Sequence, residues 1–323
     1  MSDLADAVGQ ADLQLITIGR VGVDLYPEQI GVPLAKVRTF AKSLGGSPTN
    51  VAVAAARLGH RSAVVTKVGD DGFGLYVREA LEGFGVDARF VGTDPAHHTP
   101  VVFCEIFPPD HFPLLFYRSP KAPDLNISAD ELDLEAIARV PILWTTGTAL
   151  TEEPSRSATF AALRAARGRT IHDLDHRHHL WPSVDAARAA AAEALRYAKV
   201  AVGNLDEVEM ATGTRDPDAA AEAILDLGPE LAIVKQGPRG TLARTKSERV
   251  EVSAVTIEVV NGLGAGDAFG GALVHGLLSG WPLRRTLEFA NAAGAIVASR
   301  LACADAMPTE AEVDDVLSRT AHV

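Results

Sequence analysis

Residues 259–280, Val-Val-Asn-Gly-Leu-Gly-Ala-Gly-Asp-Ala-Phe-Gly-Gly-Ala-Leu-Val-His-Gly-Leu-Leu-Ser-Gly, run from a β-branched segment through a glycine-dense turn into an Ala/Leu-rich stretch that predicts a helix. Gly262, Gly264 and Gly266 leave the backbone free of side chains and able to adopt positive φ angles. Such a turn can aim several N–H groups at one point, and the helix behind it adds the positive end of its dipole. The stretch therefore predicts an anion-binding site.

Asp267, the last residue of this turn, indicates which chemistry the site performs. A carboxylate beside an anion site suits an enzyme in which it takes a proton from a hydroxyl while the N–H groups hold a transferring phosphoryl group. Two alternatives stay open. Asp267 is a simple helix cap in the first, and in the second the turn is a dinucleotide fingerprint G-x-G-x-x-G, whose third glycine position falls on Asp267.

Length and composition favour one large α/β domain. The 323 residues are 47% hydrophobic and 22% charged, which suffices for a single large core. We expect that domain to span residues 12–323, after a tail at residues 1–11. The net charge of −12 argues against a nucleic-acid partner, so an anionic substrate requires a local basic pocket.

Cysteine usage and hydropathy favour a cytoplasmic location. Cys104 and Cys303 lie far apart in the sequence and do not suggest a disulfide framework. The acidic N-terminus lacks the basic region of a signal peptide. No apolar run reaches the ~18 residues that a membrane span needs, so we expect no membrane partner.

Polar residues follow the predicted strands of the first half. Residues 13–25 predict the first core strand, which would bring Asp24 to the edge where open α/β sheets bind ligands. A carboxylate at this position could accept hydrogen bonds from two sugar hydroxyls, or it could be an ordinary turn residue. Gly45-Gly46 precedes a helix predicted to end at Gly59, and Asn50 lies in its first turn, facing a ligand that approaches the glycines.

A small second sheet is predicted from three segments. Residues 36–44, 99–107 and 113–118 read as strands, and Pro108-Pro109-Asp110 supplies the turn between the last two. Together they would form a small sheet outside the main one, over about 34–44 and 98–119. Arg118, at the end of the last strand, is placed either to reach an acidic ligand or to be a solvated edge charge.

The second half repeats the pattern of strand, polar turn and helix. Residues 170–181 contain four histidines and two aspartates, but their spacing fits no common metal-ligand set well, and Arg177 is a fork donor for a carboxylate or phosphoryl oxygen. Strand 198–203 leads to Asn204 and Glu207, which alone would suggest a helix cap. A further strand leads through Lys235 into a turn with Gly237 and Gly240. The last small-residue helix carries Asn291.

In chain order these motifs resemble those of the ribokinase-like (PfkB) carbohydrate kinases over roughly residues 13–300. Gly264–Asp267 is similar to the family's G-A-G-D signature, and Gly45 to Asn50 to its G-G-x-x-x-N signature. The stretches around Arg177, Asn204 and Lys235 resemble D-x-[ND]-x-R-x-x-L-W, N-x-x-E and K-x-G-x-x-G. Asn261-Gly262 departs from the usual Asp-Thr, which puts the role of the missing acid in question.

The resemblance implies a three-layer α/β/α fold with a mostly parallel central sheet and a small β-sheet lid. It implies Asp267 as the base, the N–H groups of Gly264, Ala265 and Gly266 as the phosphoryl site, and Glu207 beside Mg²⁺. The implied ATP contacts are Asn204, Lys235, Gly237, Gly240 and Asn291. The implied sugar contacts are Asp24, Gly45, Gly46, Asn50, Arg118 and Arg177. Activation by K⁺ is left open, and a homodimer through the lid is expected.

Three stretches look most like the kinases of 5-dehydro-2-deoxygluconate in inositol breakdown: residues 45–50, 146–156 and 117–125. An acidic keto-sugar needs cationic contacts, which Arg118 and Arg177 would supply. A kinase of the isomeric 2-keto-3-deoxygluconate is the second interpretation, and a neutral-sugar kinase is the third. A non-catalytic sugar or nucleotide sensor and a dinucleotide oxidoreductase remain as alternatives from other classes.

Overall fold

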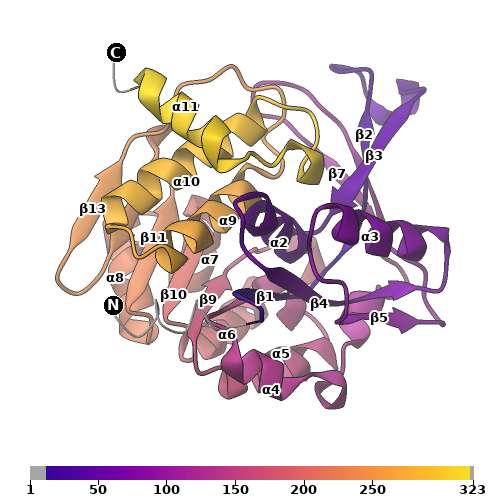
Figure 1. Ribbon diagram of the computed structural model, residues 1–323, viewed down its shortest axis with the longest axis horizontal. Helices are drawn as coiled ribbons and strands as arrows, with labels where there is room; N and C mark the ends of the chain where they lie inside the picture. Colours follow the sequence, from indigo (N-terminus) through magenta and orange to yellow (C-terminus); the bar gives the residue numbers. More distant parts are fainter. Residues whose placement is uncertain (1–11, 321–323) are drawn as a thin grey trace.

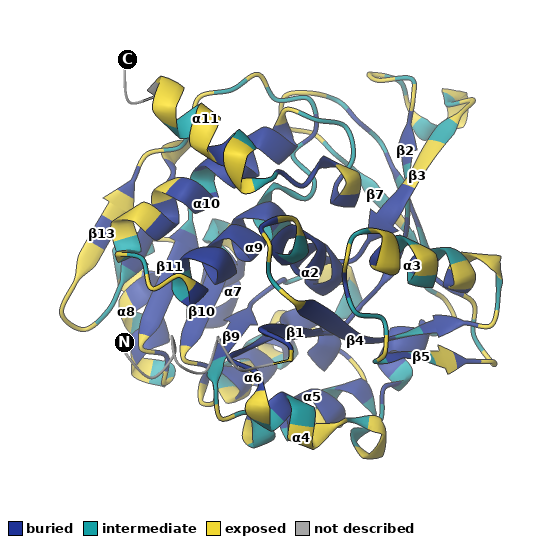
Figure 2. Ribbon diagram, viewed as in Figure 1, coloured by how far each residue is buried: buried dark blue, intermediate teal, exposed yellow. Residues whose placement is uncertain are grey.

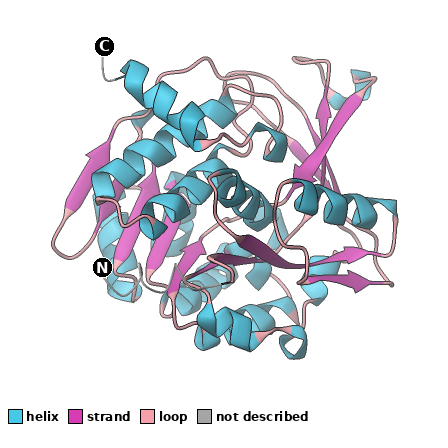
Figure 3. Cartoon of the chain, in the orientation of Figure 1, coloured by secondary structure: helices cyan, strands magenta, loops and turns pink. Residues whose placement is uncertain are grey.

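The computed structural model describes residues 12–320, so the tail predicted over residues 1–11 lies outside the described part. Nine strands form the large sheet (Figures 1 and 3). In order across the sheet they are β13 (Arg249–Val252), β12 (Thr241–Arg244), β11 (Leu231–Lys235), β10 (Val200–Asn204), β9 (Arg169–Asp173), β8 (Ile142–Thr146), β1 (Leu15–Ile18), β4 (Ser62–Gly69) and β5 (Val91–Asp94). All strands from β11 to β5 in this order run parallel to one another. Strand β12 pairs antiparallel with both of its neighbours, β11 and β13.

Helices cover both faces of this sheet, which is why its strands are continuous apolar runs. On one face lie α2 (Ser47–Arg57), α3 (Gly72–Gly83), α9 (Ala265–Leu278), α10 (Leu283–Ala298) and α11 (Glu310–Thr320). On the other lie α4 (Leu134–Arg139), α5 (Ser155–Ala165), α6 (Val184–Leu195), α7 (Leu205–Thr212) and α8 (Pro217–Leu227). Figure 2 shows the buried sheet between the two helix layers. The three-layer α/β/α prediction is confirmed.

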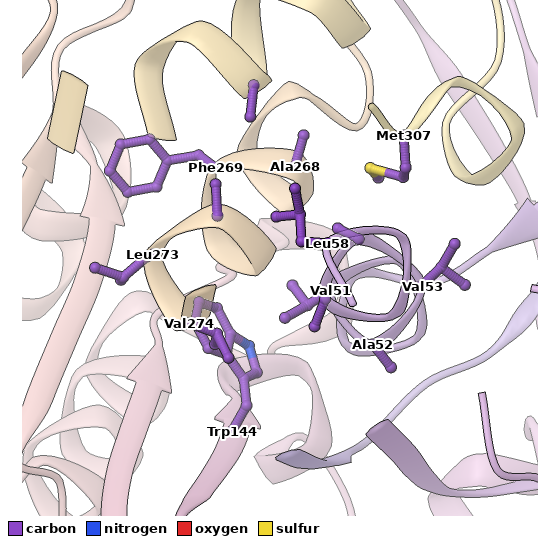
Figure 4. Packing of buried hydrophobic residues seen from close by; sticks show 14 of the residues in the cluster. Val51, Ala52, Val53, Leu58, Trp144, Ala268, Phe269, Leu273, Val274 and Met307 are labelled. Atoms are coloured by element: carbon purple, nitrogen blue, oxygen red, sulfur yellow. The ribbon is translucent and has the colours of Figure 1, made fainter. Parts of the chain in front are cut away.

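Small residues bring α9 close to α2 (Figure 4). A side chain at Gly271 would collide with Ala54 of α2, and a Cβ at Gly270 would lie 2.9 Å from the Trp144 ring of β8. Glycines in a helix interior weaken the isolated helix, but here they allow the close packing. The first turns of α2 and α9 are therefore held side by side, and both carry predicted site residues.

The small sheet has four strands in the order β3 (Phe40–Gly45), β2 (Gly22–Pro27), β6 (Val101–Cys104) and β7 (Leu114–Tyr117). Strands β6 and β7 form the predicted antiparallel hairpin. Figure 1 shows the sheet projecting beside α2 and α3. The prediction of a small second sheet is thus confirmed, with one strand more than expected.

The extra strand corrects the prediction of one core strand over residues 13–25. The chain leaves the large sheet after β1 and enters the small sheet as β2. Gly19 sits at the break with φ +142°, and a Cβ there would lie 3.0 Å from Thr146 Oγ1 and 3.1 Å from a Pro48 carbon. Asp24 therefore lies within the small sheet, paired with Ser43 of β3.

Within residues 12–320, no helix has the length and apolar character that crossing a membrane requires.

Candidate active site

A pocket lies between the small sheet and the first turns of α2 and α9. Its wall combines predicted residues from distant parts of the chain: Asp24, Gly46, Asn50, Arg177, Gly264 and Asp267. Apolar side chains of β6 and β7 contribute the lid side of the wall. The structure thus brings the predicted acid, the glycine turn and the predicted sugar contacts to one place.

Asp267 lies in the first turn of α9 and faces this pocket. Asn50 Nδ2 donates a hydrogen bond of 2.9 Å to Asp267 Oδ2, which joins the two helix starts. Burial raises the pKa of Asp267 from 3.8 to about 6, while hydrogen bonds from Asn50 and Ser47 pull it down. A carboxylate with that pKa is largely ionised near neutral pH and still basic enough to accept a proton.

The turn before α9 needs its glycines for packing as well as for backbone geometry. Gly264 has φ +82°, and a Cβ there would lie 2.9 Å from Cys303 Cβ. A Cβ at Gly266 would lie 3.3 Å from Lys235 Nζ. The first N–H groups of a helix lack intrahelical partners, so this bare turn keeps them open to an anion beside Asp267.

Asn261, which replaces the usual aspartate, shapes the same turn. Its side chain is fully buried, its Nδ2 donates to Leu301 O at 2.6 Å, and its Oδ1 accepts from Leu263 N at 3.0 Å. Both ends of the amide are thus used by the backbone. The missing carboxylate is replaced by a group that fixes the loop.

Gly45 and Gly46 make room for the polar side of the pocket. A Cβ on Gly45 would collide with the Asp24 carboxylate, and one on Gly46, whose φ is +105°, would collide with Arg20 O. Burial raises the pKa of Asp24 to about 6, and the nearby Arg20 charge counteracts that rise. The Tyr26 hydroxyl lies 3.2 Å from Asp24 Oδ2.

Of the predicted arginines, Arg177 lines the pocket and Arg118 does not. Arg177 pairs with Asp175 at 2.9 Å and lies 3.7 Å from Glu207 Oε1. Asp175 is buried and has a φ of +27°, a conformation that non-glycine residues rarely adopt. Arg118 instead forms a buried ion pair with Asp124 at 2.7 Å.

Sequence reasoning missed Arg20, Tyr26 and Cys303, which also line the pocket. Arg20 lies two residues after the end of β1, and the end of a strand is where site residues are expected. The predicted strand over residues 13–25 continued past this point, so the position of Arg20 was not recognised. Nothing local to the sequence marks Tyr26 or Cys303, because their contact of 2.7 Å joins segments 277 residues apart.

The predicted nucleotide residues do not line this pocket. Lys235 is paired in register with Asn204 across β10 and β11. Burial alone would lower the pKa of Lys235, but the carboxylates of Asp173 and Glu207 raise it above its ordinary value. A partly buried, charged amine thus lies beside Gly266.

Asn204 and Glu207 form a capping box at the start of α7, in which Asn204 N donates to Glu207 Oε2 at 2.7 Å. Burial raises the pKa of Glu207 to about 7 despite the opposing charge of Lys235. Within the described residues, no cluster of three or more His, Cys, Asp or Glu side chains could hold a metal. The histidine-rich segment 170–181 contributes to no such cluster.

The remaining nucleotide-side predictions lie at the edge of the large sheet. Gly237 and Gly240 have φ angles of +59° and +95° in the turn between β11 and β12. Asn291 of α10 accepts from Thr241 Oγ1 at 2.7 Å and donates to Ser253 O at 3.0 Å. Asn291 thus ties α10 to this turn.

Residues 12–310 match the model of the pfkB family carbohydrate kinases. The 5-dehydro-2-deoxygluconokinase of Geobacillus kaustophilus (strain HTA426) is 33% identical over 319 residues, which cover 96% of this chain and 95% of that protein. Two solved structures are also similar. An uncharacterized sugar kinase from Pyrococcus horikoshii in complex with ATP has a TM-score of 0.80 at 26% identity, covering 94% of this chain and 99% of that one. A fructokinase double mutant from Vibrio cholerae, in fructose-, ADP- and potassium-bound form, has a TM-score of 0.83 at 27% identity, covering 95% and 100%.

Proposed function

The chain belongs to the pfkB family of carbohydrate kinases, and from that premise we propose that it transfers the terminal phosphoryl group of ATP to a hydroxyl of 5-dehydro-2-deoxygluconate, in inositol catabolism. The observation that carries the reaction type is the partly buried Asp267, held by Asn50 at 2.9 Å at the start of α9 and facing the pocket. A base beside a helix N-terminus combines proton removal with stabilisation of the phosphoryl charge.

Each group of the site has a distinct task in this mechanism. Asp267 accepts the proton of the attacked hydroxyl, and Asn50 holds its carboxylate in place. The N–H groups of Gly264, Ala265 and Gly266 stabilise the phosphoryl oxygens during transfer. Asp24 accepts hydrogen bonds from other hydroxyls of the sugar, and the lid sheet excludes water that would otherwise hydrolyse ATP.

We place the nucleotide across the residues on the far side of Asp267. The contacts proposed for it are Asn204, Lys235, Gly237, Gly240 and Asn291. Mg²⁺ usually keeps several waters and takes only one or two carboxylates, and the buried Glu207 carboxylate beside Lys235 fits such an outer role. Bound there, the metal would neutralise phosphate charge, while Lys235 supplies a fixed positive charge beside the glycine turn.

The similarity to the 5-dehydro-2-deoxygluconokinase of Geobacillus kaustophilus and the charges of the pocket support an acidic acceptor. Arg20 and Arg177 both line the wall, and guanidinium groups suit a carboxylate. The isomeric 2-keto-3-deoxygluconate would satisfy the same charges, which makes it the appropriate competitor in an assay.

The test compares kcat/KM for ATP-dependent phosphorylation of 5-dehydro-2-deoxygluconate, 2-keto-3-deoxygluconate, ribose and fructose. We expect the first acid to be preferred over the second, and both acids over the neutral sugars. A clear preference for ribose or fructose would overturn the acidic substrate. No turnover with any sugar would leave a sensor, and NAD(P)H oxidation would identify an oxidoreductase.

We further propose a homodimer through the outer face of the lid, within a single domain over residues 12–323. Leu115 and Tyr117 of β7 are 47% and 61% exposed, unusual values for such large apolar side chains on a strand. We place the reaction in the cytoplasm, because Cys104 and Cys303 are both free and buried. Light scattering of the full chain and of Tyr117→Lys would test the dimer.

A further inference from the structure

Arg20 is a buried arginine in the acceptor pocket that belongs to none of the family motifs. The residue is 9% exposed, lies two positions after the end of β1 and lines the pocket. Its carbonyl oxygen accepts a hydrogen bond of 3.1 Å from Thr49 Oγ1 of α2. The backbone of Arg20 is therefore fixed, and its side chain extends into a site built for a ligand.

The guanidinium of Arg20 is not satisfied by its ionic neighbour. Its buried Nε makes no hydrogen bond with any described residue and lies 3.6 Å from Asp175 Oδ2. That oxygen already accepts from Thr148 Oγ1 at 2.8 Å, and the other oxygen of Asp175 is paired with Arg177 at 2.9 Å. None of the N–H groups of the Arg20 guanidinium makes a hydrogen bond with a described residue, and the side chain lines the pocket, so the geometry favours an acceptor supplied by a ligand.

The position of Arg20 identifies which ligand supplies that acceptor. Its guanidinium carbon lies 5.9 Å from the centroid of the Phe116 ring, on the lid side of the pocket. Asp24 belongs to the same wall, whereas Lys235 and the other proposed nucleotide contacts do not. The partner of Arg20 is therefore part of the phosphoryl acceptor and not of the nucleotide.

We propose that Arg20 binds the carboxylate of the sugar-acid acceptor and thereby sets the preference for acids over neutral sugars. This inference rests on the proposed function and adds to it the residue that reads the substrate's charge. A planar fork of N–H donors matches a carboxylate in two-point contact, which a hydroxymethyl group at the same carbon cannot reproduce. Asp175 holds Arg20 and Arg177 on either side of itself and so positions the fork.

The experiment compares the wild-type chain with Arg20→Met on two acceptors, namely 5-dehydro-2-deoxygluconate and its analogue with hydroxymethyl in place of the carboxylate. We expect Arg20→Met to lower kcat/KM for the acid by roughly 30- to 200-fold, the loss typical of a buried charged hydrogen bond. The value for the analogue should change by less than about threefold, because it makes no ionic contact. Where the analogue turns over too slowly, its inhibition constant replaces kcat/KM.

Arg78→Met is the matched control. The Arg78 guanidinium donates to Val91 O at 2.6 Å and Gly92 O at 3.0 Å, and the residue does not line the pocket. This variant should keep the wild-type ratio of acid to analogue. Should Arg20→Met fail to fold, Arg20→Lys, which keeps the charge but loses the fork, should show an intermediate ratio.

The outcomes separate this inference from the function on which it rests. A wild-type chain that phosphorylates the acid, with an unchanged ratio in both Arg20 variants, would overturn the carboxylate contact and leave the function intact. Equal losses on the acid and the analogue would also overturn it, since they would indicate a positioning effect. A wild-type chain that does not accept the acid would overturn both.

Discussion

The two sides of Asp267 are built differently. On the nucleotide side, polar side chains satisfy one another: Asn291 is bonded to Thr241 and Ser253, and Asn204 forms a capping box with Glu207. On the acceptor side, Arg20 Nε and Asn50 Oδ1 are buried and make no hydrogen bond with a described residue.

Raised carboxyl pKa values occur on both sides. Burial raises the pKa of Asp24 and Asp267 to about 6 on the acceptor side, and it raises the pKa of Glu207 to about 7 on the proposed nucleotide side, where the charge of Lys235 opposes the rise. Buried polar groups normally have partners, and perturbed carboxyls cluster where chemistry occurs. The difference in hydrogen bonding teaches that the nucleotide side is largely preformed, while the acceptor side is completed by its substrate.

The largest effect is expected from Asp267→Asn, which removes the base between the two sides. Its kcat should fall by ~10²–10⁴, the usual contribution of a general base, with a smaller effect on ATP binding. Steady-state kinetics together with calorimetric titration of ATP measure both quantities. Asp185→Asn, at a 92% exposed side chain, is the matched control. Unchanged turnover in Asp267→Asn would rule out the base.

Lys235→Met tests whether the nucleotide side acts through charge. The substitution removes one of the cations beside Asp173 and Glu207, so kcat/KM for ATP should fall by about 10²-fold, as when a transition-state donor is lost. The exposed Lys246→Met is its control. Equal activity of the two variants would mean that Lys235 has only a structural role.

The pH dependence of kcat/KM should come from Asp267. Because the base must be ionised, kcat/KM should rise tenfold per pH unit below about 6 and level off above it. Asn50→Ala removes a hydrogen bond that lowers the pKa of Asp267, so this limb should move to higher pH. A pH–rate profile of both proteins measures the shift, and coincident profiles would contradict the assigned hydrogen bond.

The free energy of unfolding should change with pH in the opposite direction to kcat/KM, falling as the pH rises. The folded state holds the protons of Asp24 and Asp267 more tightly than an unfolded chain, in which the pKa is 3.8. Their contribution to the free energy of unfolding is thus favourable below about pH 4 and is lost as the pH rises through about 6. Denaturant unfolding of the wild type and of Asp24→Asn between pH 4 and 7 would measure it. A wild-type pH dependence identical to that of Asp24→Asn would contradict the raised pKa of Asp24.

The smallest effect is expected from Asn291→Ala on the preformed side. Two hydrogen bonds are lost at a partly exposed site, which corresponds to about 1–2 kcal/mol and a fall in Tm of a few degrees. Thermal unfolding and the KM for ATP check this. A fall in Tm above about 10 °C would show that the turn carries more of the core stability than the contacts indicate.

Sequence patterns predicted central strands of the large sheet such as β10 and β11, because strands buried on both faces appear as continuous apolar runs. They did not predict β4, β5, β12 or β13. The pattern failed over residues 13–25, where the apolar character continues across the break at Gly19. The small sheet's hairpin was predictable from its turn, but the insertion of β2 beside it depends on tertiary pairing.

The glycine turn and Asn50 were predictable because each follows a short-range motif. Arg118 and Arg20 could not be assigned in this way, since their positions depend on partners outside any motif. Asp124 binds Arg118 in a buried pair, and Asp175 faces Arg20 from the end of a different strand. Which arginine faces the substrate is thus a property of the packed structure.

The most direct test of the central claim is a ³¹P NMR spectrum of the wild-type chain incubated with ATP, Mg²⁺ and 5-dehydro-2-deoxygluconate. The account predicts a new phosphomonoester signal that grows in step with ADP. A spectrum in which ATP yields only inorganic phosphate, or stays unchanged, would contradict the transfer of phosphate to a hydroxyl of this acid.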